Sequence, residues 1–427
     1  MDLITRQFQS SSEFWKKLYS WANEYPFACV LDGNGFEVPF GSSFKKIAAV
    51  GSKEHKWADG RFFSSFSEIQ KEKSVFGFLS YDLKNETEKL YSENPDPLQF
   101  PQALFFEPSA IIEEKNGEIE ITASDPDLVF DQILNQKVFI PKLLDNISFS
   151  NAITKAEYFK SIESIKNLIS DGLIYEINYC QFFESGQAFC GLSAFVTLKE
   201  IMPMPFSGWF KGKEFEIASA SPERFLKKTS SKLLSQPMKG TAKRGLNSKE
   251  DQKQIESLLN SEKERAENLM IVDLVRNDLA RVSDPGSTKV EELFGIYPFP
   301  TVFQMVSTVS SQLRKNKNWL DAISGSFPMG SMTGAPKIEV MKQIESLETR
   351  KRGAFSGAMG HVNANEDFDF NVLIRSVFIN HKVQKAGFGV GSAITIDSDA
   401  DEEWQECKNK AGGLLKIFNN TWETAQR

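Results

Sequence analysis

Three charged side chains near the C-terminus and one further upstream are of the types that hold a cation together with an anionic substrate. At 100° per residue, Glu403, Glu406 and Lys410 fall on one stripe of a predicted helix. Glu267 lies near the start of a second predicted helix, where the helix dipole alone also favours a carboxylate. Mg²⁺ usually takes one or two protein carboxylates and completes its octahedron with water and an anionic substrate. The pattern therefore allows a magnesium site between two helices, and the simpler alternative is two ordinary charged helix surfaces.

Two turn-like segments each present one ionisable side chain after a strand-like run. Glu223 lies in Ser-Pro-Glu-Arg-Phe (221–225), and Lys239 lies in Pro-Met-Lys-Gly-Thr (237–241). Turns often carry catalytic groups. Burial would raise the pKa of Glu223 and suit it to general acid catalysis, whereas a dry pocket or a neighbouring cation would lower the pKa of Lys239 and suit it to a nucleophile. For either residue taken alone, a solvated loop charge remains the alternative.

A strand is predicted over 174–183, immediately after a helix. By its two-residue period, Glu176, Asn178 and Cys180 share one face, so a carboxylate and an amide project together. The solvated face of a half-buried strand would show the same pattern, so the functional interpretation stays open at this point.

Two glycine-rich segments, 330–337 and 387–391, meet the rules for nucleotide-binding loops only in part. Pro336 precedes Lys337, whereas a P-loop needs Gly-Lys followed by Ser or Thr, and the second segment lacks the spacing of a dinucleotide-binding loop. Nucleotide binding is therefore not expected. Glycine still lets backbone N–H groups approach an anion, and a carboxylate would serve as well as a phosphate.

The elements that must position these residues are helices and strands in irregular order. Thr154 and Glu157 form a capping box before one helix, and further long helices are predicted from Leu269 to Val282 and from Trp404 to Phe418. This order favours an α+β fold with antiparallel sheets over a regular βαβ series.

The first 150 residues are predicted to form short strands joined by turns, with a hairpin at Asn116-Gly117. We expect residues 1–150 to form the N-terminal part of the fold and residues 151–420 to form the catalytic region.

The composition excludes several classes of protein. The chain has 427 residues, 50 basic and 57 acidic side chains and a net charge of −7, and it shows no basic stripe of the kind that nucleic acid requires. It contains no spanning apolar run and no signal peptide, so no membrane partner is expected and the predicted location is cytoplasmic. Four cysteines and three histidines argue against a disulfide framework and against a histidine-rich zinc site.

Taken together, the segments from about 154 to 418 resemble the chorismate-utilising enzymes, a family that includes component I of anthranilate synthase and of aminodeoxychorismate synthase, isochorismate synthase and salicylate synthase. The motifs stand in family order: Tyr-Glu-Ile-Asn-Tyr-Cys-Gln at 175–181, Ser-Pro-Glu-Arg-Phe at 221–225, Pro-Met-Lys-Gly-Thr at 237–241, the segments 265–281 and 330–337, Arg-Gly-Ala-Phe-Ser-Gly at 352–357, and 387–410. The resemblance implies two large packed antiparallel β-sheets flanked by helices, with chorismate and Mg²⁺ in a cleft.

The resemblance also implies a role for each matching residue. Glu267 and Glu406 match the metal-ligand positions, and Glu403 matches a nearby position that contacts the metal through a water molecule. Glu223 matches the acid that protonates the departing ring hydroxyl. The remaining residues match positions that bind the substrate, several of them through its carboxylates: Glu176, Gly240, Thr241, Ser331, Arg375, Gly387, Gly389 and Lys410.

Lys239 distinguishes branches within the family, because the aminodeoxychorismate-forming members carry Lys before this Gly-Thr, whereas others usually carry Ala. The resemblance therefore implies a covalent route in which Lys239 adds to the ring, ammonia then replaces it, and 4-amino-4-deoxychorismate results. Glu176 departs from the Gln that is general in the aminating enzymes, and it also differs from the lysine base of the water-using members.

Ammonia is expected from a separate glutaminase subunit of the class I amidotransferase type, because nearly all residues after 150 are used by the family resemblance. Two alternatives remain open from the sequence. One is the activity of anthranilate synthase component I, and the other is a non-catalytic subunit that binds chorismate.

Overall fold

The structure, a computed structural model, describes residues 3–58, 60–70, 72–142, 144–300 and 302–426. Within these ranges, strands β1 to β20 join one continuous ladder in which every pairing is antiparallel. The ladder is branched, and it divides into two arms that both begin at the long strand β5 (Ala103–Lys115). No helix in the described residues is long and apolar enough to span a membrane.

The first arm runs from the N-terminal strand to the strand that carries Glu176. From β5 it continues through neighbours in this order: β3 (Ile47–Trp57), β2 (Phe27–Asp32), β9 (Phe206–Lys211), β10 (Phe215–Ser221), β19 (Ser376–Asn380), β20 (Lys385–Ile394) and β8 (Glu176–Ser185). Short strands β7 (Ser150–Asn151) and β16 (Gly334–Ala335) pair with β8, and β6 (Glu118–Ala123) and β1 (Ile4–Gln9) extend the other end beyond β5.

The second arm runs from β5 to the strand that carries Lys239. Its order is β4 (Val75–Leu79), β17 (Ala358–Val362), β18 (Phe368–Val372), β11 (Arg224–Thr229), β12 (Lys232–Gln236) and β15 (Val302–Gln312), and β15 also pairs with β13 (Met238–Lys243) and β14 (Lys289–Pro298). Both β2 and β4 come from the first 150 residues and pair with later strands, so the two parts of the chain share one sheet.

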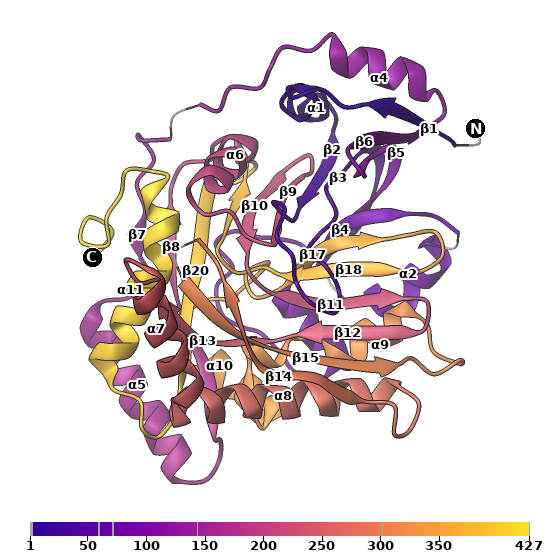
Figure 1. The fold of residues 1–427 in the computed structure, drawn as a ribbon. Helices are drawn as coiled ribbons and strands as arrows, with labels where there is room; N and C mark the ends of the chain where they lie inside the picture. The colour runs from indigo at the N-terminus through magenta and orange to yellow at the C-terminus, as the bar shows by residue number, and fades with distance from the viewer. Residues whose placement is uncertain (1–2, 59, 71, 143, 301, 427) are drawn as a thin grey trace.

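Helices cover the outside of both arms (Figure 1). In that view α8 (Glu262–Val282) crosses below β13, β14 and β15, and α11 (Ala400–Lys416) lies beside β20 with α5 (Lys155–Ser170). The others are α1 (Phe14–Asn23), α2 (Phe62–Gln70), α3 (Lys84–Thr87), α4 (Pro126–Leu134), α6 (Gly191–Ile201), α7 (Ser248–Asn260), α9 (Trp319–Ser326) and α10 (Lys337–Leu347), with 3-10 turns η1 (Tyr81–Leu83) and η2 (Gly330–Met332).

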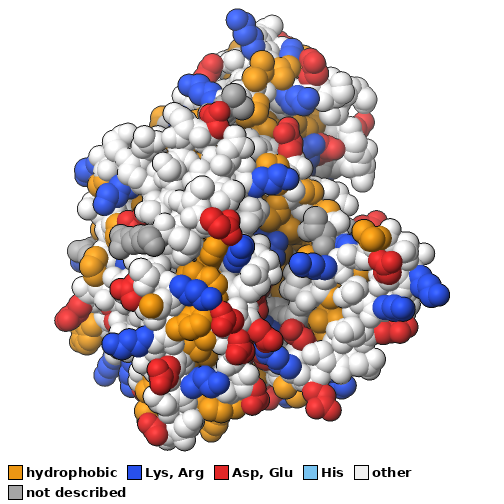
Figure 2. Space-filling view, turned by 90° about the vertical axis from the view of Figure 1, so that its left-hand side faces the viewer, with side chains coloured by type: hydrophobic (Ala, Val, Ile, Leu, Met, Phe, Trp, Pro, Cys, Tyr) orange, Lys and Arg blue, Asp and Glu red, His pale blue; other side chains and the backbone are white. Residues whose placement is uncertain are grey.

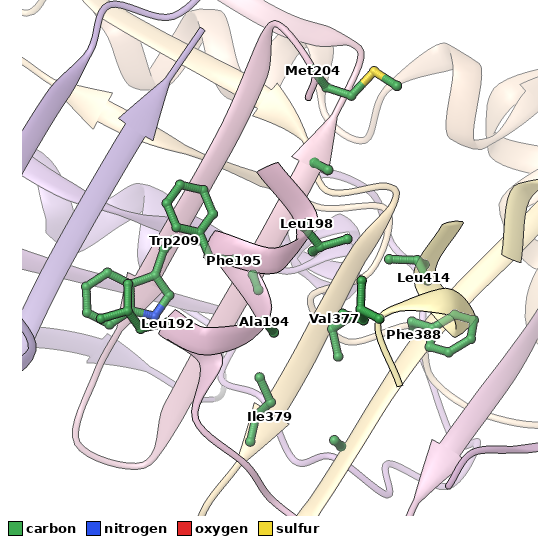
Figure 3. Packing of buried hydrophobic residues seen from close by; sticks show 14 of the residues in the cluster. Leu192, Ala194, Phe195, Leu198, Met204, Trp209, Val377, Ile379, Phe388 and Leu414 are labelled. Atoms are coloured by element: carbon green, nitrogen blue, oxygen red, sulfur yellow. The ribbon is translucent and has the colours of Figure 1, made fainter. Parts of the chain in front are cut away.

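Two hydrophobic cores hold these layers together. One lies between the arms, where the ring of Phe78 on β4 meets Phe210 on β9 edge-on at 5.2 Å. The other lies between the first arm and its helices, and Figure 3 shows Leu192, Phe195 and Leu198 of α6 against Trp209 on β9 and against β19 and β20. Because successive strand residues face opposite sides, Trp209 and Phe210 serve one core each. The expectation of two packed antiparallel sheets is thus confirmed, with β5 joining them.

Several local expectations are also confirmed. The capping box of Thr154 and Glu157 starts α5, and Asn116-Gly117 connects β5 to β6. Two details differ. Leu269 has 47% of its surface exposed and lies outside the core stripe of α8. The last helix ends at Lys416, so Phe418 packs as a buried residue beyond the helix.

On the face shown in Figure 2, acidic and basic side chains are interspersed, without a broad area of one charge. The four cysteines are free thiols, as expected from their spacing.

Candidate active site

A β-bulge sets the direction of Lys239. The register between β13 and β15 shifts between Met238 and Thr241, so Lys239 and Gly240 form the irregular part of the strand. Gly240 has a φ of 98°, and a Cβ there would lie 3.0 Å from Glu264 Oε2. Only glycine fits this left-handed, crowded position. A bulge re-aims the side chains next to it, and here the ammonium group of Lys239 meets carboxylates from α8 and β8.

Lys239 lies between two carboxylates, one on a strand of the first arm and one on a helix that packs against the second arm. Its Nζ is 3.1 Å from Glu176 Oε1 on β8 and 3.5 Å from Glu267 Oε2 on α8. Burial lowers the pKa of Lys239, but the charges of Glu176, Glu267 and Glu406 outweigh burial and hold that pKa above its ordinary value. In this arrangement Lys239 is an ammonium ion, and it must lose a proton before its nitrogen can attack a substrate.

Helices α8 and α11 each present two carboxylates three residues apart, namely Glu264 and Glu267 on α8 and Glu403 and Glu406 on α11. Burial raises the pKa of Glu267 to about 7, with Lys239 opposing the rise and Glu176 and Glu264 adding to it. Burial also acts to raise the pKa of Glu406, but Lys410, whose Nζ is 2.6 Å from Glu406 Oε1, outweighs it and lowers the pKa. The two helices thus concentrate negative charge around Lys239.

The donor atoms of this cluster fit a magnesium ion. Buried oxygens of three carboxylates have no hydrogen-bond partner: Glu176 Oε2, Glu267 Oε1 and Glu403 Oε2. Leaving such atoms without partners is costly, and carboxylate oxygens are the ligands that Mg²⁺ prefers. Across the described residues, no three His, Cys, Asp or Glu side chains form a ready-made ligand set. Lysines pair with several of these carboxylates. The residues fit the ion chemically, and its presence stays a prediction.

Glu223 is a buried carboxyl between β10 and β11. Its side chain accepts a 2.7 Å hydrogen bond from Ser331 Oγ on the η2 turn. Burial raises the pKa of Glu223 to about 7, opposed by the Ser331 hydrogen bond, the charge of Lys239 and the Met238 backbone N–H. Near neutral pH both protonation states are therefore populated, which suits a general acid.

A hydrogen-bond network ties the acid side of the site to the lysine side. Asn178, two residues after Glu176 on β8, donates from its side chain to the carbonyl of Ser331 at 2.8 Å. Arg352 donates to the carbonyls of Met332 and Asn178 at 2.7 and 2.8 Å. These bonds fix the distance between the η2 turn and β8, and hence between Glu223 and Glu176.

Arg375 carries a half-buried cation without a carboxylate partner among the described residues. Burial lowers its pKa, and the contact that its guanidinium makes is with Met202 Sδ at 3.7 Å. Arg375 directly precedes β19. The pairing between β19 and β20 ends at Phe378 and Gly387. Beyond Gly387, β20 pairs only with β8, as far as Ile394. A guanidinium without a carboxylate partner is suited to bind a substrate carboxylate in bidentate fashion.

Packing explains two of the predicted substrate-binding glycines. A Cβ on Gly389 would lie 2.6 Å from the ring of Phe355, and one on Gly387 would lie 3.0 Å from the carbonyl oxygen of Phe183. Contact between their backbone and a substrate carboxylate stays a prediction. Lys410 Nζ donates to the carbonyl of Gly391 at 2.7 Å, which places its ammonium group at the same strand.

The structure gathers Lys239, Glu176, Glu267 and Glu406 around one point and Glu223 with Ser331 beside it. Thr241 donates from its hydroxyl to Gln304 Oε1 at 3.0 Å, within the β13–β15 pairing.

Sequence reasoning missed two residues of this site, Glu264 and Asn268. The side chain of Asn268 donates to the Lys239 carbonyl at 3.3 Å. The repeated i, i+3 spacing of carboxylates on α8 and α11 is the signal that would have found Glu264.

Comparison with known proteins gives one family and several relatives. The model of the family described as chorismate binding enzyme matches residues 26–416. Aminodeoxychorismate synthase component 1 of Escherichia coli is 37% identical over 62% of this chain and 58% of its own length, so the matched part spans less than two thirds of that protein. The protein of the same name from Salmonella typhimurium is 32% identical over 81% of this chain and 77% of its own length.

Relatives with another name are also similar. Anthranilate synthase component 1 of Saccharolobus solfataricus is 32% identical over 80% of this chain and 79% of its own length. Among solved structures, anthranilate synthase component I of Streptococcus pneumoniae superposes with a TM-score of 0.77 at 25% identity, over 89% of this chain and 94% of that one. The menaquinone-specific isochorismate synthase of Escherichia coli has the same TM-score at 15% identity, over 98% of this chain and 94% of that one, which supports the shared fold.

Proposed function

Because the chain belongs to the family of chorismate-binding enzymes, we propose that it aminates chorismate with ammonia, in the presence of Mg²⁺, to give 4-amino-4-deoxychorismate for para-aminobenzoate and folate synthesis. The observation that carries this proposal is the position of Lys239, which a β-bulge presents to the carboxylate cluster beside the buried acid Glu223. The names of the relatives from Escherichia coli and Salmonella typhimurium support the same reaction.

The substrate would lie between Lys239 and Glu223, with its carboxylates toward the cations at the open edge of β20. Arg375 and Lys410 supply those cations, and both side chains are only partly buried. Glu267 and Glu406 would hold Mg²⁺, with Glu264 and Glu403 beside them. Bound there, the ion would neutralise the ring carboxylate and orient the ring.

Before the first half of the reaction, Lys239 Nζ gives one proton to Glu176, whose Oε1 lies 3.1 Å away. The neutral amine then adds to ring C2, the two conjugated ring double bonds each shift by one position, and the C4–O bond breaks. Glu223 gives its proton to the departing oxygen, so water leaves and Glu223 becomes a carboxylate. The raised pKa of Glu223, about 7, keeps a proton available for this step near neutral pH. The product of this half is a covalent adduct between Lys239 and the ring.

In the second half, ammonia adds to C4, the two ring double bonds return to their original positions, and the C2–N bond to Lys239 breaks. The adduct nitrogen keeps both its protons, so the electron pair of that bond returns to Lys239, which leaves as the neutral amine. Glu176 then returns its proton to Lys239. The new C4 substituent forms as an ammonium group. The sum is chorismate, ammonia and one proton giving protonated 4-amino-4-deoxychorismate and water.

A separate glutaminase subunit would supply the ammonia. The similar proteins from Escherichia coli and Salmonella typhimurium are called component 1, which supports a second component for this chain as well.

Anthranilate synthesis is the second candidate, and the relative from Saccharolobus solfataricus favours it, because its match covers 80% of this chain. The two candidates differ in the role of Lys239, since direct addition of ammonia at C2 needs no covalent lysine.

The test is incubation of the purified chain with chorismate, Mg²⁺ and an ammonium salt at mildly alkaline pH, with the products separated by chromatography and identified by mass. Aminodeoxychorismate supports the proposal. Anthranilate, isochorismate or salicylate as the product would overturn it. Omission of ammonium is the control that separates amination from addition of water.

A further inference from the structure

A small cavity lies behind Glu223, on the side of α8 and α9. Six polar or charged residues line it, Arg224 and Ser235 together with Glu223, Asp278, Ser326 and Ser331. The last four have exposed fractions of 5, 6, 6 and 9%. The space open to the centre of a water molecule is about 20 Å³, which exceeds the roughly 10–15 Å³ that one buried water needs. The cavity therefore has the size and the polar lining for a single ordered water.

One hydroxyl in this lining is free to bind that water. Ser326 Oγ is buried and has no hydrogen-bond partner. The other two serine hydroxyls of the lining are engaged, since Ser331 Oγ donates to Glu223 and Ser235 Oγ donates to the carbonyl of Phe225 at 2.8 Å. A buried hydroxyl without a partner is uncommon in folded proteins, and an ordered water is a usual explanation.

Asp278 connects the cavity with the protein surface. Its Oδ2 accepts a 2.6 Å hydrogen bond from Lys337 Nζ, and burial raises the pKa of Asp278 against the opposing effect of Lys337. Beyond it, the exposed Arg281 pairs with Glu88 at 3.8 Å. Asp278 is thus a carboxyl that lines the buried cavity on one side and lies near charged surface groups on the other.

The proposed reaction creates a need for such a path. Glu223 gives one proton to the departing hydroxyl in every turnover, ammonia enters neutral, and the product amine keeps its own protons. The enzyme therefore ends each turnover with Glu223 as a carboxylate, and one proton must return to it from solvent.

We propose that an ordered water held by Ser326 returns this proton from Asp278 to Glu223. The proton moves from Asp278 to the water, the water gives one of its own protons to Glu223 Oε, and solvent restores Asp278. Asp278 and Ser326 are positioning residues here, because they act on the substrate only through Glu223. This inference rests on the proposed function, since it assumes that Glu223 is the acid.

The charges around Glu223 are consistent with this path. Lys239 faces it from β13 and Lys410 from α11, and both lower its pKa. Arg224, the next residue, also lines the cavity, but its guanidinium is bound by Asp369 and by Gln236. Asp278 therefore supplies the carboxyl at the cavity, with Lys337 as its counter-ion.

The test compares single-turnover and steady-state rates of the full chain with chorismate, Mg²⁺ and ammonium, for Asp278→Asn, Ser326→Val and Ser326→Ala. Valine adds bulk at the cavity, and alanine removes only the hydroxyl. In a single turnover with enzyme in excess at pH 6, Glu223 is already protonated. For these variants we expect the single-turnover rate to stay within about twofold of wild type, because no proton has to return to Glu223. We expect the steady-state rate to fall about 10-fold, because every further turnover needs that proton. Ser235→Ala is the matched control, since its hydroxyl is bound within the protein, and we expect both rates to stay near wild type.

Two results would overturn the proposal. Either the steady-state rate stays unchanged in Asp278→Asn and Ser326→Val, or both rates fall together, which would indicate a merely structural role. If Asp278→Asn does not fold because Lys337 loses its partner, the rates of the Ser326 variants decide whether the proposal holds. A failure of the proposed function is recognised separately, from the product that the wild-type chain forms. The two failures differ because any product that requires loss of the C4 hydroxyl still consumes the Glu223 proton.

Discussion

Lys239 Nζ lies 3.1 Å from Glu176 Oε1, and this ion pair joins the last strand of one arm of the sheet to a bulge at the end of the other. The two residues are 63 positions apart in the chain. Glu176 is almost fully buried, so its charge acts on Lys239 with little screening by solvent. The proposed nucleophile is therefore held as a paired cation until substrate enters.

Replacing Lys239 with alanine should abolish the covalent route. We expect the rate of aminodeoxychorismate formation in Lys239→Ala to fall about 10³-fold or more, because nucleophilic catalysis is lost. Mass analysis of quenched wild-type enzyme without ammonia should show a chorismate-derived adduct that the variant lacks. Lys243→Ala, an exposed lysine on the same strand, is the control and should keep full activity. The same product formed at an unchanged rate by Lys239→Ala would contradict the role of Lys239.

The acid role of Glu223 predicts a pH dependence with a definite sign. Its pKa is about 7, and the protonated form is the active one, so kcat should fall as the pH rises above 7. At pH 8 only about one tenth of Glu223 would carry a proton. The measurement holds free ammonia constant by adjusting the ammonium salt. In Glu223→Gln we expect kcat to drop about 10²-fold or more, and the limb near pH 7 should disappear.

Ser331 provides a second check on the same limb. Its hydrogen bond lowers the pKa of Glu223, so Ser331→Ala should move the limb to higher pH rather than remove it. A shift to lower pH would contradict the assignment of this limb to Glu223.

Magnesium dependence should follow the carboxylates of α8 and α11. We expect Glu267→Gln and Glu406→Gln each to raise the Mg²⁺ concentration for half-maximal activity about 10-fold or more, because each removes a charged oxygen ligand. Glu262 and Glu402 are exposed glutamates on the same two helices, so Glu262→Gln and Glu402→Gln are matched controls. Equal Mg²⁺ titrations for all four variants would place the ion elsewhere.

Local sequence signals predicted the elements better than the site. The capping box at Thr154 and the hairpin at Asn116-Gly117 depend on contacts within a few residues, and both were predicted from pattern alone. The i, i+3 carboxylates on α11 and Glu267 on α8 could be named from the sequence, but their convergence could not, because it depends on two helices packing against opposite arms.

The residues that line the cavity beside Glu223 could not be predicted from the sequence either. Nothing in the sequence around Ser326 marks its hydroxyl, since the missing hydrogen bond is a property of long-range packing. The motifs that resemble a known family predicted roles for Lys239 and Glu223, and the structure added the environment that shifts their pKa values.

Arg375 offers a prediction in which function and stability move in opposite directions. Its side chain is half-buried, its guanidinium contacts Met202 Sδ at 3.7 Å, and it has no carboxylate partner among the described residues. Burying an unpaired charge costs stability, so an apolar replacement of similar length should be tolerated. For Arg375→Met we expect a melting temperature equal to or above that of wild type. If Arg375 binds a chorismate carboxylate through two charge-assisted hydrogen bonds, the same variant should raise KM for chorismate about 10- to 100-fold.

Arg375→Lys separates charge from geometry at this position. A lysine keeps the charge but lacks the planar fork, so its KM should lie between those of wild type and Arg375→Met. Thermal unfolding and initial-rate kinetics on the three proteins measure both effects. A melting temperature that falls by several degrees in Arg375→Met, together with an unchanged KM, would mean that Arg375 supports the fold and not the substrate, because loss of a stabilising contact lowers the melting temperature whereas loss of a substrate contact raises KM.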